Sequence, residues 1–415
     1  MSNKKRIVIT GIGVVSPVGI GVENYWNSLI NGISGVDVLD AFDTTDYPCK
    51  IAAQIRNFDP LEYIELKKAK KMERFTQFAV AAAKMAIEDS KIDLDKEDKT
   101  RIGSILGCGI GGLNFIEQQT KVLLERGPRR VSPFLIPMLI TNMAPGEIAI
   151  EFGLKGINFA ISTACASSNH AIGEAMRALQ YGTADIIIAG GTEGAITPLG
   201  LAGFAALKAL STRNDDPKTA SRPFDKDRDG FVIGEGSGIL VLETLEHAKA
   251  RGAKIYVELS GYGATDDAFH MTAPDNTGEA CANCIKNAIL DSGFDFADID
   301  YINAHGTSTE LNDKIETLVI KKVFGDRAYK IPISSTKSMT GHLLGAAGAI
   351  ELIACIQTII TGTIHPTANY YTPDPECDLD YIPNTARKNQ NVKVVISNSL
   401  GFGGHNSSLV VNKYE

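Results

Sequence analysis

Short apolar runs recur along the chain, and most of them end in glycine or other small residues before a helix-like segment begins. Runs that are apolar on both faces are typical of strands buried inside a layered protein. The predicted strands occupy residues 6–10, 101–106, 158–162, 185–189, 256–260, 301–304, 332–335 and 392–397. Their alternation with helix-like segments predicts an α/β fold with buried sheets.

Two of the helical segments are predicted to lie deep in the fold. Apolar residues at 172, 175, 176 and 179 follow the i, i+3, i+4, i+7 spacing of one helix face. Residues 348–360 are apolar around almost the whole helix, with Glu351 as the only charge. The surrounding stretch, 338–364, is the nearest candidate for a membrane span, but a charge near the centre of a span is costly. We therefore expect a buried helix here and no membrane segment.

The chain shows signs of an internal duplication. Strand, small-residue turn and buried helix occur in this order at 158–180 and again at 331–360, although the two copies do not align residue by residue. The basic segment 247–254 is a natural boundary between them. The sequence thus predicts an N-terminal half, 1–254, and a C-terminal half, 255–415.

Charge and cysteine content narrow the function classes. The net charge of −8 argues against a general nucleic-acid binder, which needs a basic face to neutralise phosphates. The seven cysteines show no repeated spacing, which favours reduced thiols over a disulfide framework. The first residues pass directly into a strand-like run and lack the long apolar core of a signal peptide. Together these features predict a cytoplasmic protein.

Cys165 is the first candidate for chemistry. An apolar strand ends just before it, small residues predict a sharp turn, and a helix is expected to begin at the cysteine. The positive end of a helix dipole lowers the pKa of a thiol, and free backbone N–H groups there can hold an oxyanion. The alternative is an inert buried cysteine, which is the usual fate of a free thiol.

Two histidines occupy matching settings in the second half. His305 follows the predicted strand 301–304, and His342 follows the strand 332–335 within a run of small residues. Open α/β sheets bind ligands at the ends of their strands. A single histidine at such a place is usually structural, but two histidines and Cys165 in the same setting favour a catalytic group recognised by roles rather than chain order.

Three further residues of the second half are candidates for the same site. Lys337 stands among small and apolar residues, where burial without a partner is costly, and Glu351 is the natural partner. A surface position for Lys337 is the alternative. Phe402 lies in a Gly-rich turn, 401–406, after the last predicted strand, where it could shield a site or simply pack in the turn.

Two motifs resemble binding signatures but lack the rest of the pattern. Residues 107–112 fit G-x-G-x-x-G, yet the segment about 20 residues on reads as a loop instead of a strand that ends in an acid. Cys281 and Cys284 form a C-x-x-C inside a helix-like stretch, without the further ligands that zinc needs. We expect neither a nucleotide site nor a metal site.

Taken together, the motifs resemble the β-ketoacyl-acyl-carrier-protein synthases of the thiolase superfamily, closest to the synthase II type of fatty-acid synthesis. The resemblance covers nearly the whole chain and rests on VITGIGVVSPVG, TACAS, AGGTEGAITPLGLAGF, ASRPFDKDRDGFVIGEGSG, NAHGTST, SSTKSMTGHLLGAAGA and NSLGFGGHN. It implies a thiolase-like five-layered αβαβα fold from two similar halves and a homodimer. It also implies decarboxylative condensation of an acyl group with malonyl-acyl-carrier protein, without a cofactor.

The same resemblance assigns roles to individual residues. Cys165 matches the acylated nucleophile, and His305 and His342 match the histidines of the decarboxylating site. Lys337 matches the lysine of that site, and Phe402 matches the gating phenylalanine, whose N–H shares an oxyanion hole with that of Cys165. The positions matched to substrate binding are Thr307 and Thr309 for the pantetheine arm, Ile110 for the acyl tunnel, and Glu351 beside the lysine.

The partner implied by the resemblance is acyl-carrier protein, an acidic protein. The basic residues expected to face it are Lys67, Lys70, Lys71, Arg129, Arg130 and Lys208. The first three belong to a basic run that could equally be a solvated helix face. One position departs from a common family pattern, because His405 stands where many relatives have threonine.

Two rival functions are weighed against this one. A thiolase acting on coenzyme A esters would need a second cysteine in a Gly-rich turn near the C-terminus, whereas the last cysteine, Cys377, lies in PECDLD. A non-catalytic chain-length subunit of a polyketide system would lack the nucleophile, but Cys165 is present. The preferred length of the acyl chain stays open, with Ile110 favouring a medium-to-long pocket.

Overall fold

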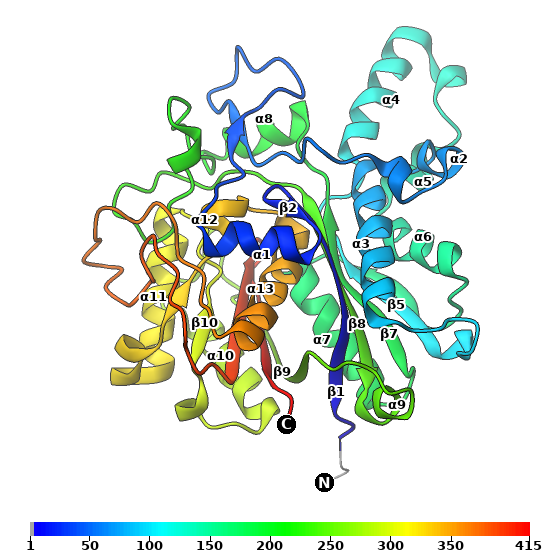
Figure 1. Ribbon diagram of the computed structural model, residues 1–415. Coiled ribbons are helices and arrows are strands. Elements are labelled where there is room, and N and C mark those ends of the chain that lie inside the picture. Colours follow the sequence, from blue (N-terminus) through cyan, green and yellow to red (C-terminus); the bar gives the residue numbers. More distant parts are fainter. Residues whose placement is uncertain (1–3) are drawn as a thin grey trace.

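A computed structural model describes residues 4–415, which form a layered α/β structure (Figure 1). The strands are β1 (Ile7–Ser16), β2 (Gly19–Ile20), β3 (Asp37–Val38), β4 (Ile51–Ala52), β5 (Ile102–Gly107), β6 (Asn158–Ile161), β7 (Ile186–Glu193), β8 (Gly236–Thr244), β9 (Val257–Asp266), β10 (Tyr301–Asn303), β11 (Ile333–Ser334), β12 (Val394–Gly401) and β13 (His405–Lys413). The helices are α1 (Val22–Ile30), α2 (Leu66–Ala69), α3 (Arg74–Ser90), α4 (Leu113–Arg126), α5 (Leu135–Leu139), α6 (Met143–Phe152), α7 (Ser167–Gln180), α8 (Pro198–Ala206), α9 (Leu245–Ala250), α10 (Glu279–Ser292), α11 (Glu310–Phe324), α12 (Lys337–Thr340) and α13 (Ala347–Thr361).

The strand order repeats once along the chain. The large sheet contains two sets of five strands, in the order β6-β5-β7-β8-β1 for the first set and β11-β10-β12-β13-β9 for the second. In each set the first three strands are parallel to one another. The fourth strand is antiparallel to the third, and the fifth is antiparallel to the fourth. The two sets meet where β1 pairs with β9 over Ile7–Ile9 and Val257–Leu259. The predicted duplication is therefore present in the topology.

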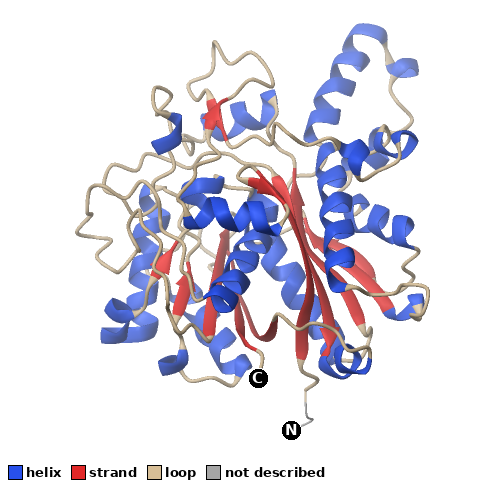
Figure 2. Cartoon of the chain, in the orientation of Figure 1, coloured by secondary structure: helices blue, strands red, loops and turns tan. Residues whose placement is uncertain are grey.

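Helices complete five layers around these two sets of strands (Figure 2). Helices α7 and α13 lie between the sheets, where α7 packs on β5 and β7 and α13 packs on β12. Helices α3 and α6 cover the outer face of the first sheet, and α10 and α11 cover that of the second. The predicted fold class is confirmed, whereas the boundary between residues 254 and 255 stays a prediction.

Most of the strands were predicted from the sequence, but the long strands β8 and β13 and the two-residue strands β2, β3 and β4 were not. The expected strand 6–10 continues to Ser16, and β8 and β13 had no counterpart among the predicted strands. Both are antiparallel members of the sheets and are not followed by the Gly-rich turn and long helix that marked the other strands. A search for strand–turn–helix units does not detect them.

The central helix α13 explains the apolar segment near the C-terminus. Residues Leu344–Thr361 are long and apolar enough to cross a membrane by composition, but 89% of that window is buried inside the fold. Glu351 lies on this helix with no exposed surface. The prediction of a buried helix is confirmed, and the single acid in it is part of the interior.

The two central helices touch at a glycine. A Cβ added to Gly348 on α13 would lie 2.3 Å from Oδ1 of Asn169 on α7 and 2.8 Å from Oγ of Ser399 on β12. At the next residue of α13, the N–H of Ala349 donates to Oγ of Ser168 at 3.1 Å. Only glycine lets the two helices approach this closely.

We expect Gly348→Ala to destabilise the protein by about 1–3 kcal/mol, because the added methyl overpacks the centre of the fold. Gly203→Ala is the matched control, since this glycine lies within α8 with no atom within 4 Å of an added Cβ. There alanine should stabilise by about 0.5–1 kcal/mol through its higher helix propensity. Thermal unfolding measures both, and a Gly348→Ala protein as stable as the wild type would contradict this packing account.

Candidate active site

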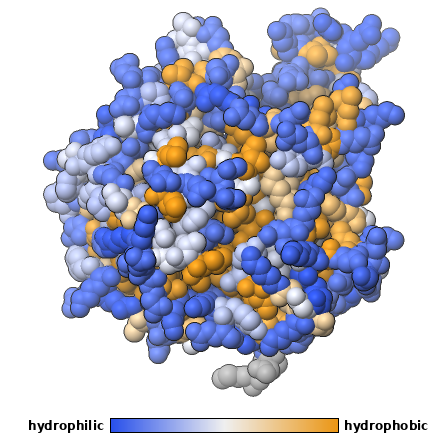
Figure 3. All heavy atoms as spheres, in the orientation of Figure 1, coloured by the Kyte–Doolittle hydropathy of each residue, from blue (hydrophilic) through white to orange (hydrophobic). Residues whose placement is uncertain are grey.

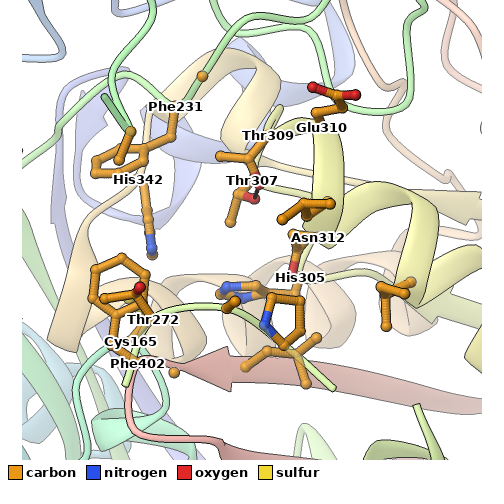
Figure 4. A pocket seen from close by; sticks show the side chains of 18 of the residues that line it. Cys165, Phe231, Thr272, His305, Thr307, Thr309, Glu310, Asn312, His342 and Phe402 are labelled. Atoms are coloured by element: carbon orange, nitrogen blue, oxygen red, sulfur yellow. Dashed lines mark hydrogen bonds between the residues drawn. The ribbon is translucent and has the colours of Figure 1, made fainter. Parts of the chain in front are cut away.

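A cavity of about 390 Å³ brings together residues from both halves of the chain. Cys165 comes from the turn before α7, while His305, His342 and Phe402 come from the second half. Figure 4 shows these four side chains around one open space, with Thr307 and Thr309 on a wall of it. Sequence positions up to 237 residues apart thus line one site, as the matching strand-end settings predicted.

Cys165 lies on a strained turn between β6 and α7. Ala164, the residue before it, has φ 49°, a left-handed conformation that is costly for a residue with a Cβ. Helix α7 begins at Ser167, two residues later than expected. The turn places the sulfur at the cavity, with 8% of the residue exposed.

Burial raises the pKa of the Cys165 thiol to about 12, although the Lys337 ammonium and a hydrogen bond from the Phe402 N–H act in the opposite direction. Carboxylates at Glu193 and Glu351 add to the rise. The lowered pKa expected from the helix position is therefore wrong for the free protein. The thiol is protonated at neutral pH and gives up its proton only as it reacts.

The two histidines face each other at the cavity. Their ring centroids lie 5.4 Å apart with planes at 84°, and each residue is 3% exposed. The N–H of Leu344 donates to Nδ1 of His342 at 3.3 Å, and Nζ of Lys337 lies 3.4 Å from Nδ1 of His305. Since Nδ1 accepts in both rings, the proton of each neutral ring belongs on Nε2.

Both imidazoles are neutral. Burial lowers the pKa of His305 and of His342 well below 6.5, and the nearby Lys337 ammonium lowers both further. Phe231 packs edge-on against the His342 ring at 5.3 Å and adds to the apolar surroundings. The site therefore presents two neutral N–H donors, a suitable arrangement for an oxygen on which negative charge develops.

Lys337 lies behind the histidines and not in the cavity lining. It is 1% exposed, and Nζ donates to the main-chain oxygen of His305 at 2.7 Å and to the carboxylate of Glu351. The predicted pairing with Glu351 is present, and the surface position weighed for this lysine is excluded. A buried ammonium held this way fixes the main chain and ring of His305.

Phe402 lines the cavity beside Cys165, at the end of β12. The preceding Gly401 lies so close to the nucleophile turn that a Cβ on it would be 2.6 Å from the oxygen of Thr163 and 3.3 Å from the nitrogen of Cys165. Gly403 and Gly404 have φ 91° and 85°, a region that favours glycine. The Gly-rich turn thus brings the Phe402 N–H to the sulfur.

Thr307 and Thr309 line the cavity, and their hydroxyls are 2.8 Å apart. Sequence reasoning missed the group that shapes this loop. The buried carboxylate of Asp313 accepts from the N–H groups of Thr307 and Ser308, at 3.0 and 3.2 Å. Arg228 lies 3.7 Å from the same carboxylate and donates to the oxygen of Thr309.

A second missed residue is Glu316 on α11. Its carboxylate accepts from the N–H groups of His305 and Gly306, both at 2.8 Å. Burial raises the pKa of Glu316 to about 7 against these hydrogen bonds. Asp313 and Glu316 lie three residues apart on one face of the helix that follows NAHGTST, so two acids on a buried helix face were the available signal.

The remaining predicted site residues are divided between the interior and the surface. Ile110 and Glu351 do not line the cavity; Ile110 is half-buried and packs against the apolar cluster that contains Cys165. Lys208 lies at the cavity wall. The other predicted docking residues are exposed, on or beside α2 and in the turn after α4: Lys67, Lys70, Lys71, Arg129 and Arg130.

The C-x-x-C motif lies inside α10, as expected, and Cys281 lines the cavity while Cys284 is buried. All seven cysteines are free. Within residues 4–415, no group of three or more His, Cys, Asp or Glu side chains is arranged to hold a metal ion.

Comparison with known proteins identifies the family of the chain. The beta-ketoacyl synthase N-terminal domain matches residues 4–248, and the C-terminal domain of the same family matches residues 256–371. The chain is 52% identical to a 3-oxoacyl-[acyl-carrier-protein] synthase 2 of Synechocystis sp. over 99% of both chains. It is 49% identical to one of Staphylococcus aureus over 100% of both.

Solved structures share the fold over the same length. A type II polyketide ketosynthase in complex with its acyl-carrier protein matches with a TM-score of 0.92 and 38% identity over 100% of both chains. A beta-ketoacyl synthase from Burkholderia phymatum matches with a TM-score of 0.92 and 36% identity over 99% of this chain and 100% of that one. The chain belongs to the beta-ketoacyl synthase family.

Proposed function

We propose that Cys165 is the acyl-carrying nucleophile with which this condensing enzyme elongates fatty acids by two carbons. The observation that carries the proposal is the meeting of the Cys165 sulfur with two neutral imidazoles, His305 and His342, in one cavity. The substrates are an acyl-carrier protein loaded with an acyl chain and one loaded with malonate, as the relatives' names support.

The first step is acyl transfer. The Cys165 sulfur attacks the thioester carbon of the acyl-carrier protein, and the resulting oxyanion accepts from the N–H groups of Cys165 and Phe402. The carbon–sulfur bond to the carrier breaks, and the thiol proton of Cys165 passes to the departing pantetheine sulfur. The high pKa of the Cys165 thiol fits this exchange, because one protonated thiol replaces another.

The second step is decarboxylation and condensation. Malonyl-carrier protein enters along Thr307 and Thr309, and its thioester oxygen accepts from Nε2–H of His305 and of His342. These donors stabilise the enolate that forms as carbon dioxide leaves. The enolate carbon attacks the acyl carbon on Cys165, and the carbon–sulfur bond breaks to release 3-oxoacyl-carrier protein. The Cys165 thiolate then takes a proton from solvent.

The carrier protein is proposed to dock on the exposed basic residues. Lys67, Lys70 and Lys71 lie on or beside α2, and Nζ of Lys71 lies 5.2 Å from the ring centroid of Phe134, just before α5. Lys208 stands at the cavity itself. Opposite charge on the partner would steer it toward these residues.

The protein is also proposed to be cytoplasmic. The seven free cysteines support a reducing location of this kind.

The enzyme is proposed to act as a homodimer through β6. The two ends of the sheet differ, because β11 is covered where the N–H of Ile333 donates to the oxygen of Asp380, whereas β6 ends the sheet with Phe159 36% exposed. Apolar side chains gather on the same side, over α4 to α6 (Figure 3), with Ile136 and Ile150 59% and 67% exposed. An open strand edge beside apolar surface favours a symmetric partner.

Replacing Cys165 with alanine should lower condensation by more than about 10³-fold, because the covalent intermediate is lost. Decarboxylation of malonyl-carrier protein depends on the two histidines and should stay measurable in the same variant. Rates of 3-oxoacyl product and of carbon dioxide release separate the two steps. Normal condensation by Cys165→Ala would contradict the proposed role.

The histidine pair makes a prediction about pH. Because burial holds both pKa values well below 6.5, His305 and His342 should stay neutral from pH 8 to about 6, where an ordinary imidazole becomes charged. Nitrogen NMR of histidine-labelled enzyme should show both as fixed Nε2–H tautomers, with His305→Asn and His342→Asn used for assignment. A shift of either signal with a midpoint near 6.5 would be inconsistent with neutral donors.

The dimer is tested by Phe159→Asp together with Ile150→Asp, which should convert it to a monomer because two charges would be buried at the interface. Leu290→Asp is the control, since Leu290 is 68% exposed on α10, far from this strand edge. Sedimentation velocity measures the mass of each. A dimer that survives the double change, or is lost in the control, would rule out this interface.

A further inference from the structure

The Gly-rich loop at 107–112 has a ligand within the protein itself. The loop looked like a dinucleotide signature, but its N–H groups point at the buried carboxylate of Glu193, at the end of β7. The N–H groups of Gly109, Ile110 and Gly111 donate to this carboxylate at 2.9, 3.2 and 3.2 Å. A carboxylate therefore occupies the place that a phosphate would take in a nucleotide site.

A fourth N–H reaches the same carboxylate from the other half of the chain. Gly345 donates to Glu193 at 3.2 Å. A Cβ on Gly109 or on Gly345 would lie 2.9 or 2.8 Å from Oε2 of Glu193, so glycine is required at both positions for this approach. Glu193 thus connects the loop after β5 to the turn before α13, and neither segment is its neighbour in the sequence.

Each of these segments contributes to a different side of the active site. Ile110 packs against the apolar cluster that holds Cys165, the residue proposed to carry the acyl group. Gly345 follows Leu344, which lines the cavity and donates its N–H to Nδ1 of His342. One carboxylate therefore fixes both the wall near the acyl group and the turn that sets the tautomer of a histidine.

We propose that Glu193 is a positioning and specificity-determining residue, which sets the acyl pocket through Ile110 and holds His342 in register with it. The inference rests on the proposed function of Cys165 and His342. Its donors are main-chain N–H groups and the Cys108 thiol, so the carboxylate acts on loop position and not on substrate. A shift of Ile110 would change the packing of the apolar cluster that holds Cys165. One methylene of misfit in an apolar pocket alters selectivity by roughly 10–200-fold.

The test compares Glu193→Gln and Glu193→Asp with the wild type. Single-turnover acylation of Cys165 is followed by mass spectrometry, with carrier proteins that bear acyl chains from hexanoyl to palmitoyl. Glutamine brings an NH₂ group against N–H donors, and aspartate withdraws the carboxylate by one methylene. We expect the ratio of long-chain to short-chain acylation to change by about tenfold or more in Glu193→Gln and less in Glu193→Asp.

Glu243→Gln is the matched control, because Glu243 is equally buried on the adjacent strand β8 but is bound by Arg251 and His247, away from the cavity. A purely structural role for Glu193 would change the acylation rate in parallel for every chain length, which is the pattern expected of the control. An unchanged ratio in both Glu193 variants would overturn the inference. Failure of the wild type to acylate at any chain length would instead overturn the proposed function.

Discussion

The close packing of α7 against α13 is the constraint on which the active site depends. The nucleophile belongs to the first half of a duplicated fold and the histidines to the second, so neither half contains the site alone. Gly348 lets the two central helices touch, and the contact holds the turns before them side by side. The Cys165 sulfur and the His342 ring meet through these two turns, and the His305 ring joins them from the loop after β10.

Buried charge organises this meeting point without entering the cavity lining. Lys337, which is paired with Glu351, donates to the main-chain oxygen of His305, and Glu316 accepts from the N–H of His305. Glu193 accepts from the N–H of Gly345, in the turn that follows His342. Each charge is costly to bury and is held by more than one hydrogen bond, which makes the main-chain positions hard to move. The same apolar surroundings keep the histidines neutral and the thiol protonated. The reacting groups are thus neutral at rest, and buried charges outside the cavity hold them in place.

Much of this could be predicted from the sequence, and the limits have physical causes. Cys165, His305 and His342 were found because each follows an apolar strand, and strand ends share an edge of the sheet. The pKa of Cys165 was predicted in the wrong direction, because the helix dipole is visible in the sequence and burial is not. Glu193 was missed because its ligands are main-chain N–H groups, which leave no pattern in side-chain identity.

The central claim is that Cys165 holds an acyl group until malonyl-carrier protein arrives. The most direct measurement is a single-turnover chase, in which enzyme acylated on Cys165 is isolated, mixed with malonyl-carrier protein and followed by mass spectrometry. The account predicts that the acyl mass leaves the Cys165 peptide in step with one carbon dioxide and one 3-oxoacyl-carrier protein. An acyl mass that stays on Cys165 while product forms, or that never appears there, would contradict it.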